Sequence, residues 1–269
     1  AGRGTPEGGI YLDASHLGAD FIMQNFRGMS LRCRDVGYDL PNAPVVVSPT
    51  AHFIMGGLRI DQDCRTDLEG LFAAGEDAAG VHGANRLGGN GVVESTVFGG
   101  IAGDTIAEYL TEFRECTVQD SQISEIIEST LKPFKHKQSA SIYSLRDRLK
   151  NNMWENAGLV RSEASLESAD MEMKEIREQL SLIALTQGNR AFHLEWMEYL
   201  SILNYLDVCD LIIESAKLRK ESRGSHFRSD FPAKEDNLPL SNICIRKNKE
   251  VQFSPVMMNR MKPDTSESV

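Results

Sequence analysis

The sequence has 269 residues, of which 41% are hydrophobic and 25% charged, a globular composition that excludes a disordered or fibrous chain. Its 29 basic and 39 acidic side chains give a formal net charge of -10, so it lacks the electropositive footprint of a general nucleic-acid-binding protein. No apolar run approaches the roughly 18–20 residues of a membrane span, and the opening residues lack a signal-peptide pattern. Five scattered cysteines without a Cys-x-x-Cys pair indicate reduced thiols in the cytoplasm, and neither a disulfide framework nor a zinc site.

The first forty residues predict a small mixed region. Residues 10–12 have the pattern of a strand, and a helix is expected to begin near Asp20. The β-branched run Val45–Val47 predicts another strand. The opening sequence, residues 1–6, has the composition of a loop, so we expect a piece of a longer protein.

A glycine-rich region follows, with twelve of the 22 glycines between residues 56 and 103. Such a density predicts tight turns and the close backbone approach that ligand sites often need. Strands are expected, in chain order, at residues 52–55, 58–60 and 71–74. The first two are expected to form a hairpin around Gly56 and Gly57. Residues 92–110 predict a helix whose glycines leave a bare face toward a sheet or a ligand.

Glycine becomes rare between residues 119 and 220, where apolar residues recur at intervals of three and four. Three amphipathic helices are expected, with apolar positions at Ile142, Leu145, Leu149 and Met153, at Leu166, Ala169, Met173, Ile176, Leu180 and Ile183, and at Trp196, Leu200 and Leu203. Their short connections predict an antiparallel bundle. After residue 237 the chain is β-rich, with strands expected near residues 243–245 and 251–253.

Four positions in the glycine-rich region have side chains or amides suited to ligand binding. His52 and Arg86 can together bind a carboxylate, although for either residue taken alone a core histidine or a structural salt bridge is the better explanation. Glu76 follows a predicted strand end, where an acid can accept hydrogen bonds from a ribose, or can be an ordinary loop carboxylate. Residues 89–91 open the next helix, whose free amides suit an electron-rich group. The sequence contains neither a Gly-x-Gly-x-x-Gly fingerprint nor a Walker loop or nucleophile elbow.

Several of these segments resemble one known family. They are PTAHFIMGG (49–57), GLFAAGE (70–76), HGANRLGGN (82–90), LRDRLKNNMWENAGLVR (145–161), RKESRGSHFRSDFP (219–232) and IRKNKEVQFSPVMMNRMKP (245–263). Together, and in this order, they resemble the flavoprotein subunit of the succinate dehydrogenase/fumarate reductase family, of which L-aspartate oxidase is a relative. The resemblance covers nearly the whole chain and marks it as the C-terminal portion of such a flavoprotein.

The resemblance implies roles for individual residues. His52 would bind a dicarboxylate, Arg86 would clamp a carboxylate beside the flavin, and Glu76 would hold the FAD ribose. The helix start would approach the flavin ring through Asn90, Gly91, Val92 and Val93. The implied reaction is hydride exchange between flavin N5 and succinate or fumarate. The implied partner is an iron–sulfur electron-transfer subunit. The implied location of this chain is the cytoplasm, peripheral to a membrane through other subunits.

The chain also departs from the family pattern. It contains no Gly-x-Gly-x-x-Gly segment and no counterpart of the family's proton-donating arginine. Gly91 stands where many members have serine, and Glu94 where many respiratory members have aspartate. Two alternatives therefore remain: an L-aspartate oxidase-like flavoenzyme, and a non-catalytic fragment or binding module.

The expected fold class is α+β, in four parts. These are a remnant of a capping domain, the C-terminal part of an FAD-binding α/β domain, a three-helix bundle domain and a β-containing tail, over residues 1–40, 41–115, 116–228 and 229–269.

Overall fold

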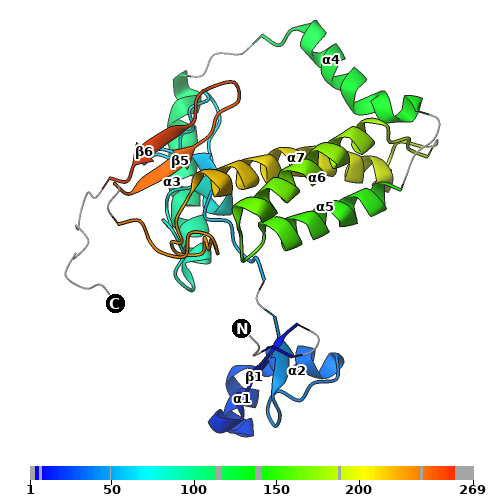
Figure 1. Cartoon of the computed structure of the whole chain (residues 1–269). Helices are drawn as coiled ribbons and strands as arrows, with labels where there is room; N and C mark the ends of the chain where they lie inside the picture. Colours follow the sequence, from blue (N-terminus) through cyan, green and yellow to red (C-terminus); the bar gives the residue numbers. More distant parts are fainter. Residues whose placement is uncertain are drawn as a thin grey trace. The chain divides into compact units, whose positions relative to one another are not determined.

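The computed structural model describes residues 4–5, 8–48, 50–112, 117–136, 141–186, 189–236 and 239–257. Pro49, Cys116 and most of the opening loop and of the polar terminus lie outside these ranges. The structure divides into two compact units, residues 1–52 and 53–269, and each is described by itself. Helices and short two-stranded sheets make up both units, which confirms the α+β class (Figure 1). The predicted four-part division stays a prediction.

The first unit has the predicted strand–helix–strand order. Strand β1 (Ile10–Leu12) pairs antiparallel with β2 (Val45–Val47). Helices α1 (Ala19–Asn25) and α2 (Arg27–Asp35) lie between them in the chain, preceded by a short 3-10 turn, η1 (Ser15–Leu17). A small core holds the unit together, formed by Ile22, Leu40 and Val45.

The hairpin predicted around Gly56 and Gly57 is wrong. Strand β3 (Leu58–Arg59) pairs instead in parallel with β4 (Ala78–Ala79), which follows the 3-10 turn η2 (Gly75–Asp77). The reason lies at Gly57, where a Cβ atom would meet the carbonyl oxygen of Asp77 at 2.3 Å. The glycine thus allows close packing of two distant segments and does not form a turn.

The buried strand predicted at residues 71–74 is also wrong. Only an isolated antiparallel bridge between Arg65 and Phe72 forms there. Gly70 and Gly75, both at positive φ, end this extended stretch on either side before a ladder can form. The helix expected at residues 92–110 is confirmed as α3 (Asn90–Glu112).

The three predicted helices of the bundle are confirmed as α5 (Ile142–Ala157), α6 (Glu163–Ser181) and α7 (Leu194–Leu218). They lie side by side around one apolar core (Figure 1). A further helix, α4 (Asp120–Leu131), and the turn η3 (Lys132–Lys135) precede them. Trp196 attaches the end of α4 to the bundle, because its indole N–H donates to the Thr130 carbonyl at 2.9 Å.

The tail forms the predicted β structure, with β5 (Ser241–Cys244) antiparallel to β6 (Gln252–Pro255). Between α7 and β5 the chain runs through the segment 219–232. Among the described residues, no helix is long and apolar enough to cross a lipid bilayer.

Candidate functional site

The loop that carries Arg86 forms the centre of the candidate site, directly before α3. The Cζ atom of Arg86 lies 4.4 Å from the centroid of the Phe53 ring, a cation–π arrangement. Its Nη1 makes only a long contact of 3.4 Å to the neighbouring Leu87 carbonyl. Its Nε is buried and has no hydrogen-bond partner within the described structure. The structural salt bridge considered for Arg86 is thus absent among the described residues, and a donor remains available for a ligand.

A second buried polar pair lies beside this arginine. Nε2 of His82 is 2.7 Å from Oε2 of Glu94, and the two side chains are only 7% and 2% exposed. The other carboxylate oxygen, Oε1 of Glu94, is buried without a partner in the part of the chain that the structure describes. The His82 ring also contacts Phe53 edge-on, at 5.3 Å between centroids. Phe53 therefore contacts both His82 and Arg86.

The start of α3 brings backbone amides to the same place. At Gly91 a Cβ atom would lie 3.4 Å from the Phe53 ring and 3.5 Å from Nη1 of Arg86, so the helix start packs against this cation–π pair. The first amides of a helix have no partner within it. Val92 and Val93 are 77% and 57% exposed, which leaves this end of the helix open to a ligand. The amide of Asn90 donates to the Leu87 carbonyl at 3.3 Å.

Glu76 lies in the turn η2, close to the same region of the fold. Its Oε1 accepts a hydrogen bond of 2.9 Å from the backbone N–H of Ile54, and its side chain is exposed. A Cβ atom at Gly75 would lie 3.2 Å from Oγ of Ser95 on α3, so η2 lies against the first turns of that helix. Glu76 and the helix start are thus parts of one structural region.

The segment 219–232 packs against the loop that carries Arg86. The N–H of Ser225 donates to the carbonyl of Ala84 at 3.1 Å. Gly224 lies so close that a Cβ atom would be 2.1 Å from the same oxygen, and its φ is +60°. The sequence marked this segment as a motif but gave no sign of this contact, because the partners are far apart in the chain.

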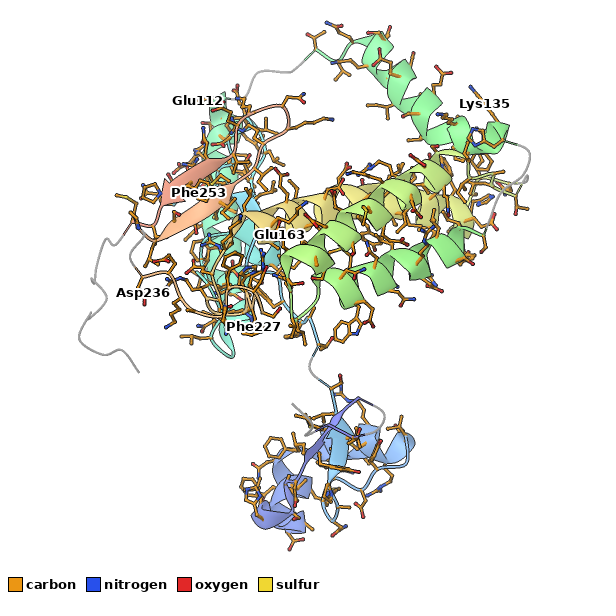
Figure 2. The ribbon with its side chains drawn as sticks, viewed as in Figure 1. Glu112, Lys135, Glu163, Phe227, Asp236 and Phe253 are labelled. Carbon is orange, nitrogen blue, oxygen red and sulfur yellow. The ribbon has the colours of Figure 1, made fainter. Side chains whose placement is uncertain are left out.

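Buried ion pairs hold this segment to the bundle. Arg228 is fully buried and bonds to Asp230, to the Ala216 carbonyl and to Glu163. Glu163 lies at the start of α6 (Figure 2). The Arg228 guanidinium holds the pKa of Asp230 well below its usual range. Nearby, His226 accepts from Arg161 at 2.9 Å. Burial lowers its pKa, and the positive charges of the neighbouring arginines lower it further. The segment is therefore a rigid, charge-paired support.

His52 is the last residue of the first unit, where its side chain is exposed. Its pairing with Arg86 stays a prediction. The interpretation of His52 as a buried core histidine is therefore wrong. Within the second unit, the structure brings together Arg86, Gly91 and Glu76 with their neighbours, and adds Phe53, His82 and Glu94, to which the sequence assigned no role. The signal for Phe53 and His82 was only their place inside the recognised motifs, and Glu94 was marked only as a position where many respiratory members have aspartate.

The residues present fit a flavin. A flavin ring is electron-rich at one edge, and this site offers unpaired helix amides, the positive end of α3 and a guanidinium with a free Nε. Gly99, Gly100 and Gly103 leave one stretch of α3 bare, with nothing within 4 Å of where their Cβ atoms would be.

Comparison with known proteins agrees with this geometry. The model of the FAD binding domain matches residues 1–92, and that of the fumarate reductase flavoprotein C-term matches residues 146–268. A fumarate reductase (CoM/CoB) subunit of Methanothermobacter marburgensis is 40% identical over 94% of this chain and 45% of its own length. L-aspartate oxidase 1 of Ralstonia nicotianae is 34% identical over 83% of this chain and 40% of its own length.

A solved quinol-fumarate reductase with menaquinol molecules superposes with a TM-score of 0.87 at 28% identity, over 97% of this chain and 47% of that chain. The chain thus spans less than half the length of the relatives it matches. It carries part of an FAD-binding domain. The chain belongs to the family of flavoprotein subunits of succinate dehydrogenases and fumarate reductases.

Proposed function

We propose that this chain forms part of an FAD-dependent oxidoreductase that interconverts succinate and fumarate. The observation that carries the proposal is Arg86, whose stacked guanidinium keeps a buried, unpartnered Nε directly beside the start of α3. A buried donor without a partner costs free energy, roughly 1–3 kcal/mol, unless a ligand satisfies it. A carboxylate is the ligand that matches a guanidinium in charge and shape.

In this proposal Arg86 holds one carboxylate of the substrate, and binding of the dicarboxylate by His52 stays a prediction. Binding at Arg86 fixes the orientation of the carbon–carbon bond that is oxidised or reduced. The guanidinium also draws electron density toward the carboxylate, which stabilises charge that develops on the adjacent carbon. The stacking against Phe53 excludes water from one side of this interaction.

FAD, when bound, supplies the hydride acceptor and donor at its N5 atom. The amides of Gly91, Val92 and Val93 would hold the electron-rich edge of the flavin, with Asn90 at the same helix start. Glu76 would accept from the ribose through the oxygen that does not bind Ile54. These contacts would hold the cofactor next to Arg86.

The electron partner follows from the family. The relatives are named as subunits, and we infer that the protein containing this chain passes electrons to an iron–sulfur protein of the same complex. We also infer a cytoplasmic location, peripheral to a membrane through other subunits.

A second candidate is an L-aspartate oxidase activity, because such an enzyme is 34% identical to this chain. Glu94, at the position where many respiratory members have aspartate, is buried against His82, and its Oε1 has no partner among the described residues.

The test is fumarate reduction by reduced benzyl viologen, measured in the protein that contains this chain. Arg86→Lys keeps the charge but loses the paired donors, and should lower kcat/KM by about 10²-fold. Hydrogen peroxide produced from L-aspartate, without fumarate reduction, would replace this proposal with the oxidase.

A further inference from the structure

We propose that the buried His82–Glu94 pair is a positioning device for Arg86 and acts through the ring of Phe53. The inference rests on the proposed function, in which Arg86 binds a carboxylate, and it assigns a role to three residues that the reaction itself does not use.

Arg86 is oriented by stacking more than by hydrogen bonds. Its Nε has no partner in the described ranges, and the only bond that its Nη1 makes there is the 3.4 Å contact to Leu87. Its close contact is with the face of Phe53, at 4.4 Å. A guanidinium held mainly by an aromatic face follows that ring when the ring tilts.

Phe53 is in turn fixed by its neighbours. The His82 ring meets it edge-on, with 5.3 Å between centroids and an interplanar angle of 73°. Gly91 packs against the same ring, because a Cβ atom added to Gly91 would lie 3.4 Å from the Phe53 ring. The orientation of Phe53 therefore depends on the orientation of the His82 ring.

Within the described ranges, the side chain of His82 makes one hydrogen bond, 2.7 Å to Glu94, which extends from α3. Both side chains are nearly buried, so no water competes for this bond. The order of contacts is Glu94, His82, Phe53 and Arg86, and it ties the angle of the guanidinium to α3, the helix whose start would hold the flavin.

The experiment observes Arg86 directly, by nuclear magnetic resonance of the whole chain labelled with 15N-arginine. The Hε resonance of Arg86 is assigned by its loss in Arg86→Lys, and the Phe53 ring current should move it upfield. Arg146, whose Cζ lies 5.4 Å from the centroid of Tyr143, provides an internal control. Fumarate titrations of the same samples report the carboxylate affinity.

Glu94→Ala should move the Arg86 Hε resonance downfield and weaken fumarate binding about 10-fold, while the Arg146 resonance stays in place. Glu94→Gln retains an acceptor for His82 and should keep both properties near the native values. Phe53→Leu removes the ring itself and should reproduce the Glu94→Ala result without touching the buried carboxylate. In the Arg86→Lys background, Glu94→Ala should have no further effect on affinity.

An unmoved Arg86 resonance in folded Glu94→Ala would overturn the proposal. If Glu94→Ala unfolds the chain, the other two variants provide the test. An unmoved Arg86 resonance in Phe53→Leu would overturn the proposal. A displaced Arg86 resonance in folded Glu94→Gln would also overturn it. If the resonance moves as expected but fumarate binds to no variant and not to the native chain, the positioning role stands and the carboxylate role of Arg86 fails.

Discussion

The contact between Gly224 and Ala84 gives the most specific stability prediction. At φ +60° an alanine costs about 1–2 kcal/mol, because its Cβ crowds the following carbonyl. That Cβ would also lie 2.1 Å from the Ala84 oxygen, so the two loops must separate. Separation breaks the Ser225 N–H bond to the same carbonyl, about 0.5–1.5 kcal/mol. Gly224→Ala should therefore lower the free energy of unfolding by about 1.5–3.5 kcal/mol.

The matched control is Gly99→Ala on α3, where nothing lies within 4 Å of the added Cβ. In a helix interior this change should raise the free energy of unfolding by about 0.5–1 kcal/mol. Urea unfolding followed by circular dichroism measures both changes. Hydrogen exchange at the Ser225 amide localises the first, and its protection should fall about 10–100-fold. Equal urea midpoints for native and Gly224→Ala protein, with the Ser225 amide still protected, would refute the argument.

Burial lowers the pKa of His226, so the folded state favours the neutral ring. The ring therefore takes up a proton more readily in the unfolded chain, and the free energy of unfolding falls as pH drops below the unfolded pKa of about 6.5. The urea midpoint of His226→Gln should depend less on pH than the native midpoint between about pH 7 and pH 5, and parallel profiles would contradict this. Burial and the charge of Asp210 raise the pKa of the Cys209 thiol to about 11. Native Cys209 should therefore react with iodoacetamide far more slowly at about pH 8 than the urea-unfolded chain, and equal rates would contradict its burial. Leu206→Ala, at a fully buried position, should lower the free energy of unfolding by about 2–5 kcal/mol. Leu182→Ala, at a position 67% exposed, should change it by less than about 0.5 kcal/mol, and a similar loss in both variants would contradict the assigned core.

The parts of the fold that the sequence predicted are those with strong local signals. Apolar spacing such as Leu166, Ala169 and Met173 marks one face of a helix, and these three residues are indeed buried together. The β-branched run Val45–Val47 likewise became strand β2. Such signals need no knowledge of distant partners.

The hairpin prediction failed because a distant partner decided the structure. Gly57 permits contact with Asp77, twenty positions away, and the sequence cannot distinguish this use of glycine from a turn. The same holds for Gly224 and Ala84. In the site, Arg86 and Glu76 were found through motifs, but the stack of Phe53 between His82 and Arg86 became visible only in three dimensions.

The central claim is that Arg86 clamps a dicarboxylate beside a bound flavin. The most direct measurement is the visible absorption spectrum of FAD in the protein that contains this chain, with and without fumarate, for native protein and Arg86→Lys. We expect bound flavin in both proteins and a fumarate-dependent band shift only in the native one. The same shift in Arg86→Lys, or a spectrum of free FAD in the native protein, would contradict it.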